Sequence, residues 1–378
     1  MSSLAELPTP AALIDVARMQ ANILRMQQRM DALGVHLRPH LKTSKCPQVA
    51  AAQRAAGARG ATVSTLKEAE EFFDAGIDDL VYAVGMVPAR LPQALALRRR
   101  GCTLTLVTDS VAGAEAIAAH GRAHGETWPV WIEVDADGHR SGVDPEGEAL
   151  LAVAAALAGG GARLDGVMAH AGSSYGLDTP AALQALAEQE RARTVRAAER
   201  LRAAGHACPV VSVGSTPTAL SAAQLAGVTE VRAGVYVFFD LVMHNVGVCT
   251  LDEIALSVLT RVIGHQADKG WVIVDAGWMA MSRDRGTQRQ RQDYGYGQAC
   301  SEDGRPIPGL CLDDANQEHG ILHWRGDAGG EPLDRRFPVG SLLRLLPNHA
   351  CATGAQHPAY QALRPDGRTE AWPRFNGW

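Results

Sequence analysis

A strand-like segment followed by a helix-like segment recurs between residue 36 and about residue 240, and this repeat most constrains the fold of the chain. Eight strand-like segments are short apolar or alternating runs, at residues 36–42, 60–66, 79–84, 103–109, 129–135, 164–170, 209–215 and 230–236. Segments rich in Ala, Leu, Glu and Arg lie between them, at residues 46–56, 66–75, 89–99, 111–123, 145–158 and 181–205. Eight such alternations predict a parallel sheet closed into a (β/α)8 barrel. A doubly wound sheet is disfavoured, because no G-x-G-x-x-G follows the first strand.

After about residue 245 the pattern changes to strand-like runs without regularly interleaved helices. These runs, at residues 253–264, 271–275, 340–346 and 369–372, are separated by turns containing Gly, Asp and Pro. The apolar run 9–16 precedes the first helix of the barrel and has no place among its strands. We therefore predict a barrel domain over residues 17–245 and a mostly β domain over residues 246–378 that includes the strand 9–16.

The bulk properties exclude several classes of protein. A chain of 378 residues is long enough for one large α/β domain and a smaller one. A net charge of −5, with scattered Lys and Arg, argues against nucleic acid as a partner. The N-terminus lacks a basic segment followed by an apolar one, and no stretch of about 18 apolar residues occurs, so we expect a cytoplasmic protein without membrane contact. Seven cysteines without CxxC pairs fit a reducing compartment.

Lys42 lies at the end of the first predicted strand, in or just before a strand-to-helix loop. Barrel enzymes build their active sites from these loops. A lysine there is either a solvated surface charge or an amine that forms a Schiff base with an aldehyde. The second role requires a lowered pKa, for which Arg38, His40 and Lys45 are the neighbouring candidate cations.

Two further strands end in residues of interest. Arg140 follows the fifth strand, and it is either a surface arginine paired with Asp135 or Asp137 or a residue over the mouth of the barrel. His170 ends the sixth strand and is followed by a polar segment that contains Tyr175. A histidine there is either part of the core or a contact to a cofactor.

Small residues and hydroxyls follow the seventh and eighth strands. They are Gly214, Ser215, Thr216, Gly234 and Val235. Barrel enzymes commonly hold a phosphate at this place, with backbone N–H groups and the positive end of a short helix. Ordinary turns are the alternative. A phosphate site and a strand-end lysine in one barrel together suggest pyridoxal phosphate, whose aldehyde would bond to Lys42.

The segment 347–353 contains the motif H-x-C, at His349 and Cys351. In an extended segment the side chains at i and i+2 point the same way, so this pair could bind one zinc ion, with water and substrate completing the shell. A chance occurrence is the alternative. The polar cluster at residues 316–320 is either a turn or a group of residues with a substrate or supporting role.

These motifs together resemble a known family over essentially the whole chain. They are P-H-x-K-T-x-K at residues 39–45, G-H-R-S-G-V at 138–143, the segments 170–175, 214–218, 232–236 and 317–320, and H-x-C. The chain is similar to the fold-type III pyridoxal-phosphate enzymes of the D-threonine aldolase and D-serine dehydratase family. The resemblance implies an alanine-racemase-like barrel followed by a β domain, and a homodimer in which one subunit's second domain lies near the other's barrel.

The resemblance also implies roles for individual residues. Lys42 would hold pyridoxal 5'-phosphate, with His170 and Tyr175 near its ring. Arg140 resembles the arginine near the phenolic oxygen, and Arg232 the arginine near the pyridine nitrogen, a position that this family does not keep uniformly. The residues around the phosphate would be Gly214, Ser215, Thr216, Gly234, Val235 and Tyr236. The ligands of zinc or another divalent metal would be His349 and Cys351.

The metal motif separates the activities within this family. Its aldolases carry H-x-D, whereas its dehydratases resemble this chain in carrying H-x-C. We therefore expect a dehydratase (ammonia-lyase) acting on a D-3-hydroxyamino acid, with conversion of D-threo-3-hydroxyaspartate to oxaloacetate and ammonia as the first choice. Lys42 would also remove the α-proton. The candidates for binding the second substrate carboxylate are Arg140, Arg283 and Arg285.

Other activities remain open at this point. Within the same family they are a D-serine dehydratase and a D-threonine or 3-hydroxy-D-aspartate aldolase. In a different class, the chain would be a non-catalytic carrier of pyridoxal phosphate. The carriers of this fold have no second domain, so residues 246–378 weigh against that alternative.

Overall fold

A computed structural model describes residues 3–326 and 331–378, and the chain divides into two compact units. The barrel unit comprises Arg25–Gly234 with Asn376–Trp378, and the β unit comprises Met1–Leu24 with Val235–Phe375. The division therefore falls inside the first long helix and directly before Val235.

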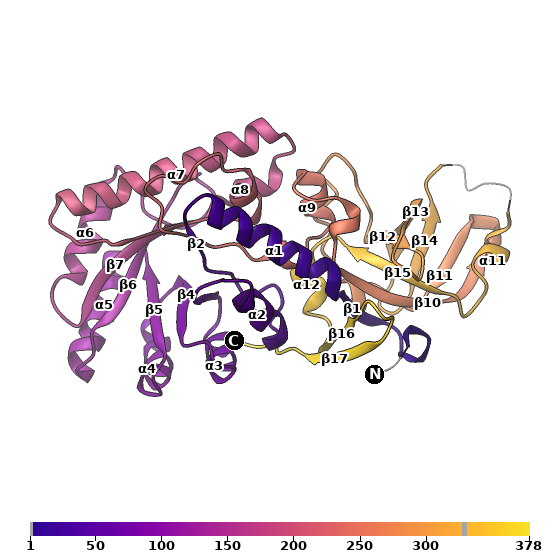
Figure 1. Ribbon diagram of the computed structural model, residues 1–378, viewed down its shortest axis with the longest axis horizontal. Helices are drawn as coiled ribbons and strands as arrows, with labels where there is room; N and C mark the ends of the chain where they lie inside the picture. Colours follow the sequence, from indigo (N-terminus) through magenta and orange to yellow (C-terminus); the bar gives the residue numbers. More distant parts are fainter. Residues whose placement is uncertain (1–2, 327–330) are drawn as a thin grey trace. The chain divides into compact units, whose positions relative to one another are not determined.

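The strands of the barrel unit form one parallel sheet (Figure 1). They are β2 (His36–Leu37), β3 (Ala61–Val63), β4 (Asp79–Gly85), β5 (Thr103–Thr108), β6 (Trp128–Val134), β7 (Ala162–Ala169), β8 (Val210–Val213) and β9 (Glu230–Val231). Their order in the sheet is β2-β9-β8-β7-β6-β5-β4-β3. Apart from the pairing of β2 with β9, the order follows the chain, as in a (β/α)8 barrel.

Two hydrogen bonds join the end strands β2 and β3 and close the sheet. His40 and Thr62 form a parallel bridge, in which the Thr62 N–H donates to the Pro39 carbonyl at 2.8 Å. The Leu41 N–H donates to the Thr62 carbonyl at 2.9 Å. The predicted eight-stranded barrel is therefore confirmed. Strand β2 ends at Leu37 rather than at residue 42, although the Arg38 and His40 N–H groups still donate to the Val231 and Ala233 carbonyls beyond it.

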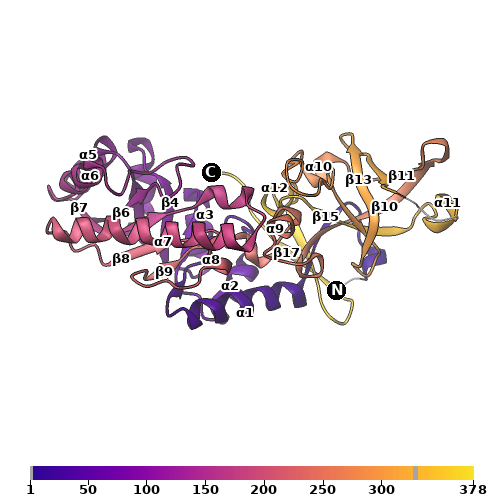
Figure 2. The same ribbon diagram turned by 90° about the horizontal axis from the view of Figure 1, so that it is seen from above.

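Helices follow the strands at each of the six predicted places. The helices before and within the barrel unit are α1 (Val16–Ala32), α2 (Pro47–Ala55), α3 (Leu66–Asp74), α4 (Leu91–Arg99), α5 (Val111–His124), α6 (Glu148–Leu157), α7 (Pro180–Ala203) and α8 (Thr216–Ser221). Thr65, Ser110 and Thr179 each accept a backbone N–H at the start of a helix, which fixes where α3, α5 and α7 begin. Helix α7 packs on β7 and β8, and Figure 2 shows it beside both strands.

The β unit contains a second, mostly antiparallel sheet of order β11-β14-β13-β12-β15-β10-β1-β16-β17. Its strands are β1 (Ala11–Asp15), β10 (Leu256–Gln266), β11 (Trp271–Val274), β12 (Gly297–Cys300), β13 (Pro306–Ala315), β14 (Gly320–Trp324), β15 (Leu342–Pro347), β16 (Ala359–Leu363) and β17 (Thr369–Pro373). Its helices are α9 (Leu241–Val246), α10 (Trp278–Met281), α11 (Leu333–Arg336) and α12 (Ala350–Gly354). An additional pairing of β10 with β11 closes six of the strands around an apolar core.

The sequence predicted five of these strands and missed four. The predicted runs appear as β1, β10, β11, β15 and β17. The missed strands are β12, β13, β14 and β16. Strand β13 contains Pro306, Pro308 and Gly309, which break the alternating pattern, and the other three have at most five residues.

Two further properties of the described residues bear on the bulk expectations. No helix among residues 3–326 and 331–378 is both long and apolar enough to cross a membrane. All seven cysteines are free thiols, and Cys351 is less buried than the other six.

A buried ion-pair network inside the barrel unit holds three strands together. The Arg38 Nε lies 2.8 Å from the Glu230 carboxylate, and its Nη1 lies 2.9 Å from Asp79. Glu230 also accepts the Ser212 hydroxyl at 2.7 Å. Arg38 follows β2, Glu230 belongs to β9, and Asp79 begins β4, so one guanidinium links segments that are distant in the sequence.

Replacement of Arg38 by Met should destabilise the protein by about 3–5 kcal/mol, because it leaves the Glu230 carboxylate buried without its cation. Denaturant unfolding of the wild type and the variant measures this change. Arg163→Met is the matched control, because Arg163 pairs with Asp165 at the surface. Its replacement should lower the free energy of unfolding by less than about 1 kcal/mol. Equal losses in the two variants would contradict the role of the buried network.

Candidate active site

Lys42 lies in a turn at residues 41–44, directly after the hydrogen bonds that close the barrel. Its side chain is exposed, whereas Leu41, Thr43 and Ser44 around it are buried. The turn is thus anchored on both sides, and only the amine faces outward. The Lys42 N–H approaches the His40 Nδ1 at 3.4 Å, which directs the His40 ring toward the same turn.

The two histidines of this region are uncharged at neutral pH. Burial lowers the pKa of His40 well below its usual value, and the charges of Lys42, Arg232 and Arg140 lower it further. Burial likewise lowers the pKa of His170 to about 3. Both rings respond to the same three cations, so these side chains share one electrostatic environment in the barrel unit.

His170 is held by its Nδ1, which lies 3.0 Å from the Gly214 carbonyl. A carbonyl only accepts, so the Nδ1 carries the proton and donates. The ring centroid lies 6.2 Å from that of Tyr175, at an interplanar angle of 44°. The sequence placed both residues after β7, and the structure places their rings together.

Arg232 is 4% exposed and lies in the interior of the barrel unit. Its Nη1 donates to the Ser212 hydroxyl at 2.6 Å, and its Nη2 donates to the Ala169 carbonyl at 2.7 Å. Burial lowers the pKa of this guanidinium, while Glu230, Glu190 and Glu133 raise it. Arg140 is different, since half of its side chain is exposed and its nearest carboxylate is Glu133, at 3.7 Å. The expected pairing of Arg140 with Asp135 or Asp137 is not the one observed.

The loop after β8 is rigid, and several of its polar groups already have partners. The Gly214 N–H donates to Glu190 at 3.1 Å, and the Ser215 N–H donates to the Thr218 hydroxyl at 3.0 Å. The Ser215 hydroxyl lies 3.0 Å from that of Ser174, in the loop after β7. Thr216 begins helix α8 and is buried. A phosphate at this loop would therefore rely on hydroxyls and on amides beyond Gly214 and Ser215.

Two glycines in these loops have no room for a side chain. Gly214 has a φ of +127°, and a Cβ there would lie 2.6 Å from the Arg232 carbonyl. A Cβ on Gly234 would lie 3.0 Å from the His40 carbonyl and 3.1 Å from the Thr43 hydroxyl. The loop after β9 thus lies directly against the Lys42 turn. The next residues, Val235 and Tyr236, begin a buried 3-10 turn that belongs to the β unit.

Glu190 was not singled out from the sequence, although it links two of the predicted loops. Its Oε1 accepts the Ala171 N–H at 2.8 Å and the Gly214 N–H at 3.1 Å. Burial raises the pKa of this carboxyl, and hydrogen bonds from the Thr218 hydroxyl and the two amides oppose that shift. Nothing in an Arg- and Glu-rich helix such as α7 distinguishes this glutamate, because its partners are backbone amides from other segments.

None of the three expected neighbouring cations acts as a free cation beside Lys42. Arg38 pairs with Glu230 and Asp79, and Lys45 lies 3.1 Å from the buried Glu68 carboxylate. His40 is neutral for the reasons given above. Arg140 and Arg232 are the charges that the structure brings into this region instead.

His349 and Cys351 lie at the start of helix α12 in the β unit, not in an extended segment. The expectation of an extended H-x-C is therefore wrong, because only His349 has extended backbone angles, and the helix begins at Ala350. The two side chains nevertheless interact. Burial would lower the pKa of His349, but the Cys351 thiolate, and then Asp284, raise it to about 11.

Asp284 and Asp240 support this pair. The His349 Nδ1 lies 2.7 Å from an Asp284 oxygen, which leaves its Nε2 for another partner. A carboxylate in this place orients metal-binding histidines in many proteins. Asp240 accepts the Ala350 N–H at 2.9 Å and fixes the start of α12. Asp284 lies 65 residues before His349, so the sequence gave no sign of the contact.

The described residues contain no group of three or more His, Cys, Asp or Glu side chains placed to hold a metal ion. The pair of His349 and Cys351 therefore represents two protein ligands at most. Arg283 stacks on Trp278 at 5.0 Å, and Arg285 lies 3.0 Å from Asp293. The polar cluster at residues 316–320 forms the turn between β13 and β14, in which the Asn316 N–H donates to the His319 carbonyl.

The chain matches two protein families. Residues 14–242 match the family described as "Alanine racemase, N-terminal domain", and residues 255–363 match the family described as "Putative serine dehydratase domain". The chain belongs to the alanine racemase family of this N-terminal domain, as the resemblance implied. The expected fold and the expectation of an enzyme are both confirmed.

Individual relatives cover the whole chain. D-threo-3-hydroxyaspartate dehydratase of Delftia sp. (strain HT23) is 68% identical over 377 residues, 100% of this chain and 99% of the relative. D-threonine aldolase of Arthrobacter sp is 30% identical over 98% of this chain and 92% of the relative. A solved structure, described as a Cys-to-Ala mutant of D-threo-3-hydroxyaspartate dehydratase in the metal-free form, has a TM-score of 0.99 and 68% identity, and each chain covers 100% of the other.

The lowered pKa of His170 should make the stability of the protein depend on pH. The unfolded chain takes up a proton on this histidine below about pH 6.5, whereas the folded protein does so only near pH 3. The contribution of the neutral His170 to the free energy of unfolding is therefore fully present above pH 6.5. It is lost as the pH falls toward 3, by up to about 1.4 kcal/mol per pH unit. His170→Gln should flatten this dependence in denaturant unfolding at pH 4–7.

His206→Gln is the control, because it removes a partly buried histidine that lies outside this region. An unchanged pH dependence in His170→Gln would contradict the assignment of a neutral, buried His170.

Proposed function

We propose that the protein is a pyridoxal-phosphate- and zinc-dependent dehydratase that converts D-threo-3-hydroxyaspartate to oxaloacetate and ammonia. The observation that carries this proposal is the 68% identity, over the full chain, to a dehydratase with that substrate. The interacting pair of His349 and Cys351 supports it further, because a thiolate occupies the place of the aldolase carboxylate in H-x-D.

The residues of the barrel unit fit pyridoxal phosphate by their chemistry. Lys42 is an exposed amine on a rigid turn, and His170 is a neutral ring held in one orientation. The hydroxyls of Ser215 and Thr216 suit a phosphate, as do the loops kept close by Gly214 and Gly234. We propose Tyr175, Arg140, Arg232, Val235 and Tyr236 as further contacts. When bound, pyridoxal phosphate stabilises negative charge at the substrate Cα.

The side chains of this chain then supply binding and proton transfer. The Lys42 amine would accept the α-proton of the substrate, because it is a basic group whose charge acts on both His40 and His170. A neutral His170 does not act as a proton donor to the Lys42 amine. Its Nδ1 keeps its proton, which it donates in a hydrogen bond to the Gly214 carbonyl. Arg140 is exposed and only loosely paired, so its guanidinium is available to a substrate carboxylate.

The β unit fits a divalent metal through two ligands. The Nδ1 of His349 is committed to Asp284, so a metal would bind at Nε2 in place of the proton that this nitrogen carries, and Cys351 would contribute a thiolate. When bound, a divalent metal withdraws electrons from a hydroxyl group and makes it a better leaving group. Asp240 and Asn348 hold the segments that carry these ligands.

We extend the proposal to the organisation of the protein. A homodimer, a cytoplasmic location and domain limits of 17–245 and 246–378 all follow from the family resemblance and the sequence pattern. The aldolase activity is the second candidate, and the observation that favours it is the 30% identity to D-threonine aldolase over nearly the whole chain. In that case glycine and an aldehyde would be released instead of ammonia.

The substrate assay separates these activities. We expect ammonia from D-threo-3-hydroxyaspartate at a higher rate than from D-serine or D-threonine, and no glycine from any of them. Ammonia and glycine are measured separately in each reaction. Glycine release without ammonia would refute the dehydratase and favour the aldolase.

Lys42→Ala should lose the visible absorbance of the bound cofactor and lower kcat by about 10³-fold or more, because it removes both the anchor and the base. Lys67→Ala is the control, since Lys67 pairs with Glu71 at the surface of α3. An unchanged spectrum in Lys42→Ala would overturn the assignment of the lysine.

Chelator treatment should abolish ammonia release, and a divalent metal should restore it. His349→Ala and Cys351→Ala should each lose the bound metal, as measured by elemental analysis of the purified protein. His323→Ala is the matched control, because His323 also contacts a carboxylate, Asp313 at 3.3 Å, on a strand of the same unit. Full metal content in both variants would contradict the proposed ligands.

A further inference from the structure

Arg344 is a buried arginine in the middle of strand β15. In the sheet it lies opposite Leu259 of β10 on one side and Cys300 of β12 on the other. It is 5% exposed. Its strand neighbours Leu343 and Leu345 point into the apolar core of the β unit. Side chains alternate along a strand, so Arg344 points to the opposite face. Arginine is rarely this buried unless it is paired.

Within the described residues, the side chain of Arg344 has no hydrogen bond and no ion pair. Its Nε is buried and unpartnered. Burial lowers the pKa of the guanidinium. The negative charge of Asp15 opposes this shift, and the positive charge of Arg18 adds to it. A buried polar group without a partner in a native protein calls for a ligand, an ion or water.

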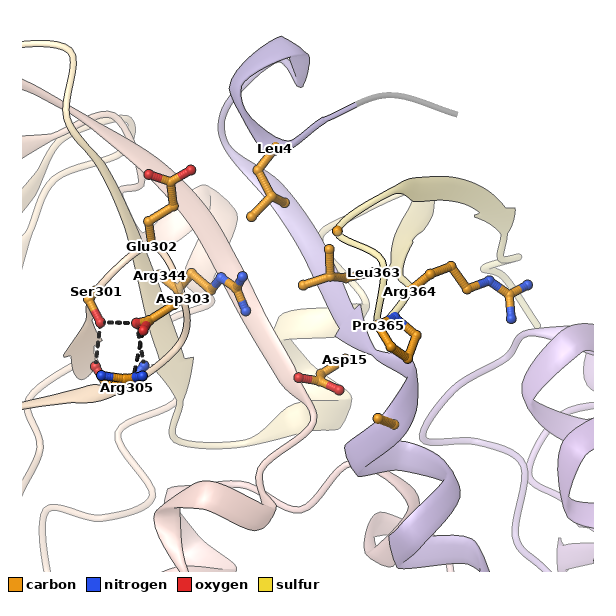
Figure 3. A pocket seen from close by; sticks show the side chains of 12 residues that line it. Leu4, Asp15, Ser301, Glu302, Asp303, Arg305, Arg344, Leu363, Arg364 and Pro365 are labelled. Carbon is orange, nitrogen blue, oxygen red and sulfur yellow. Dashed lines mark hydrogen bonds and ion pairs between the residues drawn. The ribbon is translucent and has the colours of Figure 1, made fainter.

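The carboxylates closest to Arg344 are engaged with other groups. Asp15 lies 3.4 Å from the Arg18 Nε and also accepts the Arg18 N–H. Asp303 lies 3.0 Å from the Arg305 Nε. Glu302 is exposed, and Figure 3 shows its carboxylate directed away from Arg344. Asp15 and Asp303 therefore act on Arg344 only through their charge, and neither forms an ion pair with it.

The guanidinium faces a hollow of about 800 Å³ in the β unit (Figure 3). The turn at residues 301–305 forms one wall, and Leu4, Leu363 and Pro365 provide apolar surface on the other. Gly304 lies directly on the guanidinium, since a Cβ there would be 2.9 Å from the Arg344 Nη1. The third arginine of the rim, Arg364, is paired with Glu370 at 2.8 Å.

We propose that this hollow binds a small carboxylate anion, with Arg344 as its principal contact. A guanidinium offers two parallel N–H donors that match a carboxylate. The apolar wall suits the short carbon chain of an aliphatic acid. All of these residues lie in the β unit and none is a proposed catalytic or metal-binding residue, so the site is independent of the proposed reaction.

The experiment compares thermal unfolding in sodium chloride and in sodium succinate, at equal ionic strength and pH. In the wild type, succinate should raise the Tm by about 2–5 °C more than chloride, with saturation. Arg344→Met should lose this extra rise, and it should have a higher Tm than the wild type in chloride, because it removes an unpaired buried charge. Arg305→Met is the control, since Arg305 lies on the same rim but is 84% exposed and should keep the response.

Several outcomes would overturn the proposal. They are an equal effect of succinate and chloride on the wild type, a full response in Arg344→Met, or a response lost in Arg305→Met as well. If Arg344→Met does not fold, calorimetric titration of succinate into the wild type and Arg305→Met decides the question, and absence of binding refutes the site. An Arg344→Met protein with a changed sedimentation coefficient and a wild type insensitive to succinate would instead assign the hollow to a second copy of the chain.

Failure of this site and failure of the proposed function can be told apart. Lys42→Ala should keep the response to succinate, because Lys42 belongs to the barrel unit. Loss of the response in Lys42→Ala alone would place the anion at the proposed active site and refute the Arg344 site.

Discussion

Closure of the barrel by Thr62 is the constraint on which the proposed active site depends. The Thr62 backbone bonds to Pro39 and Leu41 on either side of His40. These two bonds fix the backbone immediately before Lys42, and the buried Thr43 and Ser44 fix it immediately after. The amine of Lys42 is thus presented from a segment whose position is set by sheet geometry. Gly234 brings the loop after β9 against the same turn, which adds a third fixed point.

The sequence predicts the barrel well because its repeat is long and regular. Most strands are apolar or alternating, helices follow them at short distances, and caps such as Thr65 and Ser110 are local. The β unit was predicted less completely, because β13 contains proline and glycine, and short strands such as β14 are defined by their partners rather than by their own residues. The strand ends of the barrel were placed too late, at residues 42, 215 and 236, whereas the strands end at Leu37, Val213 and Val231.

The predicted site residues share a property that the sequence can show, which is their position at strand ends. What the sequence could not show are the partners that come from elsewhere in the chain. Glu190 contacts backbone amides at residues 171 and 214, and Asp284 contacts His349 across 65 residues. The charge state of a site residue likewise depends on side chains from elsewhere in the chain. His40 was one of three candidate cations, but burial beside Lys42, Arg232 and Arg140 leaves it neutral.

The carboxylate of Glu190 has a consequence for engineering. It holds the loops after β7 and β8 by their backbones, in addition to side-chain contacts such as that between the Ser174 and Ser215 hydroxyls. Any transplant of these loops to another barrel must therefore carry the glutamate with them. A helix residue that touches no ligand thereby sets the limits within which new specificities can be selected.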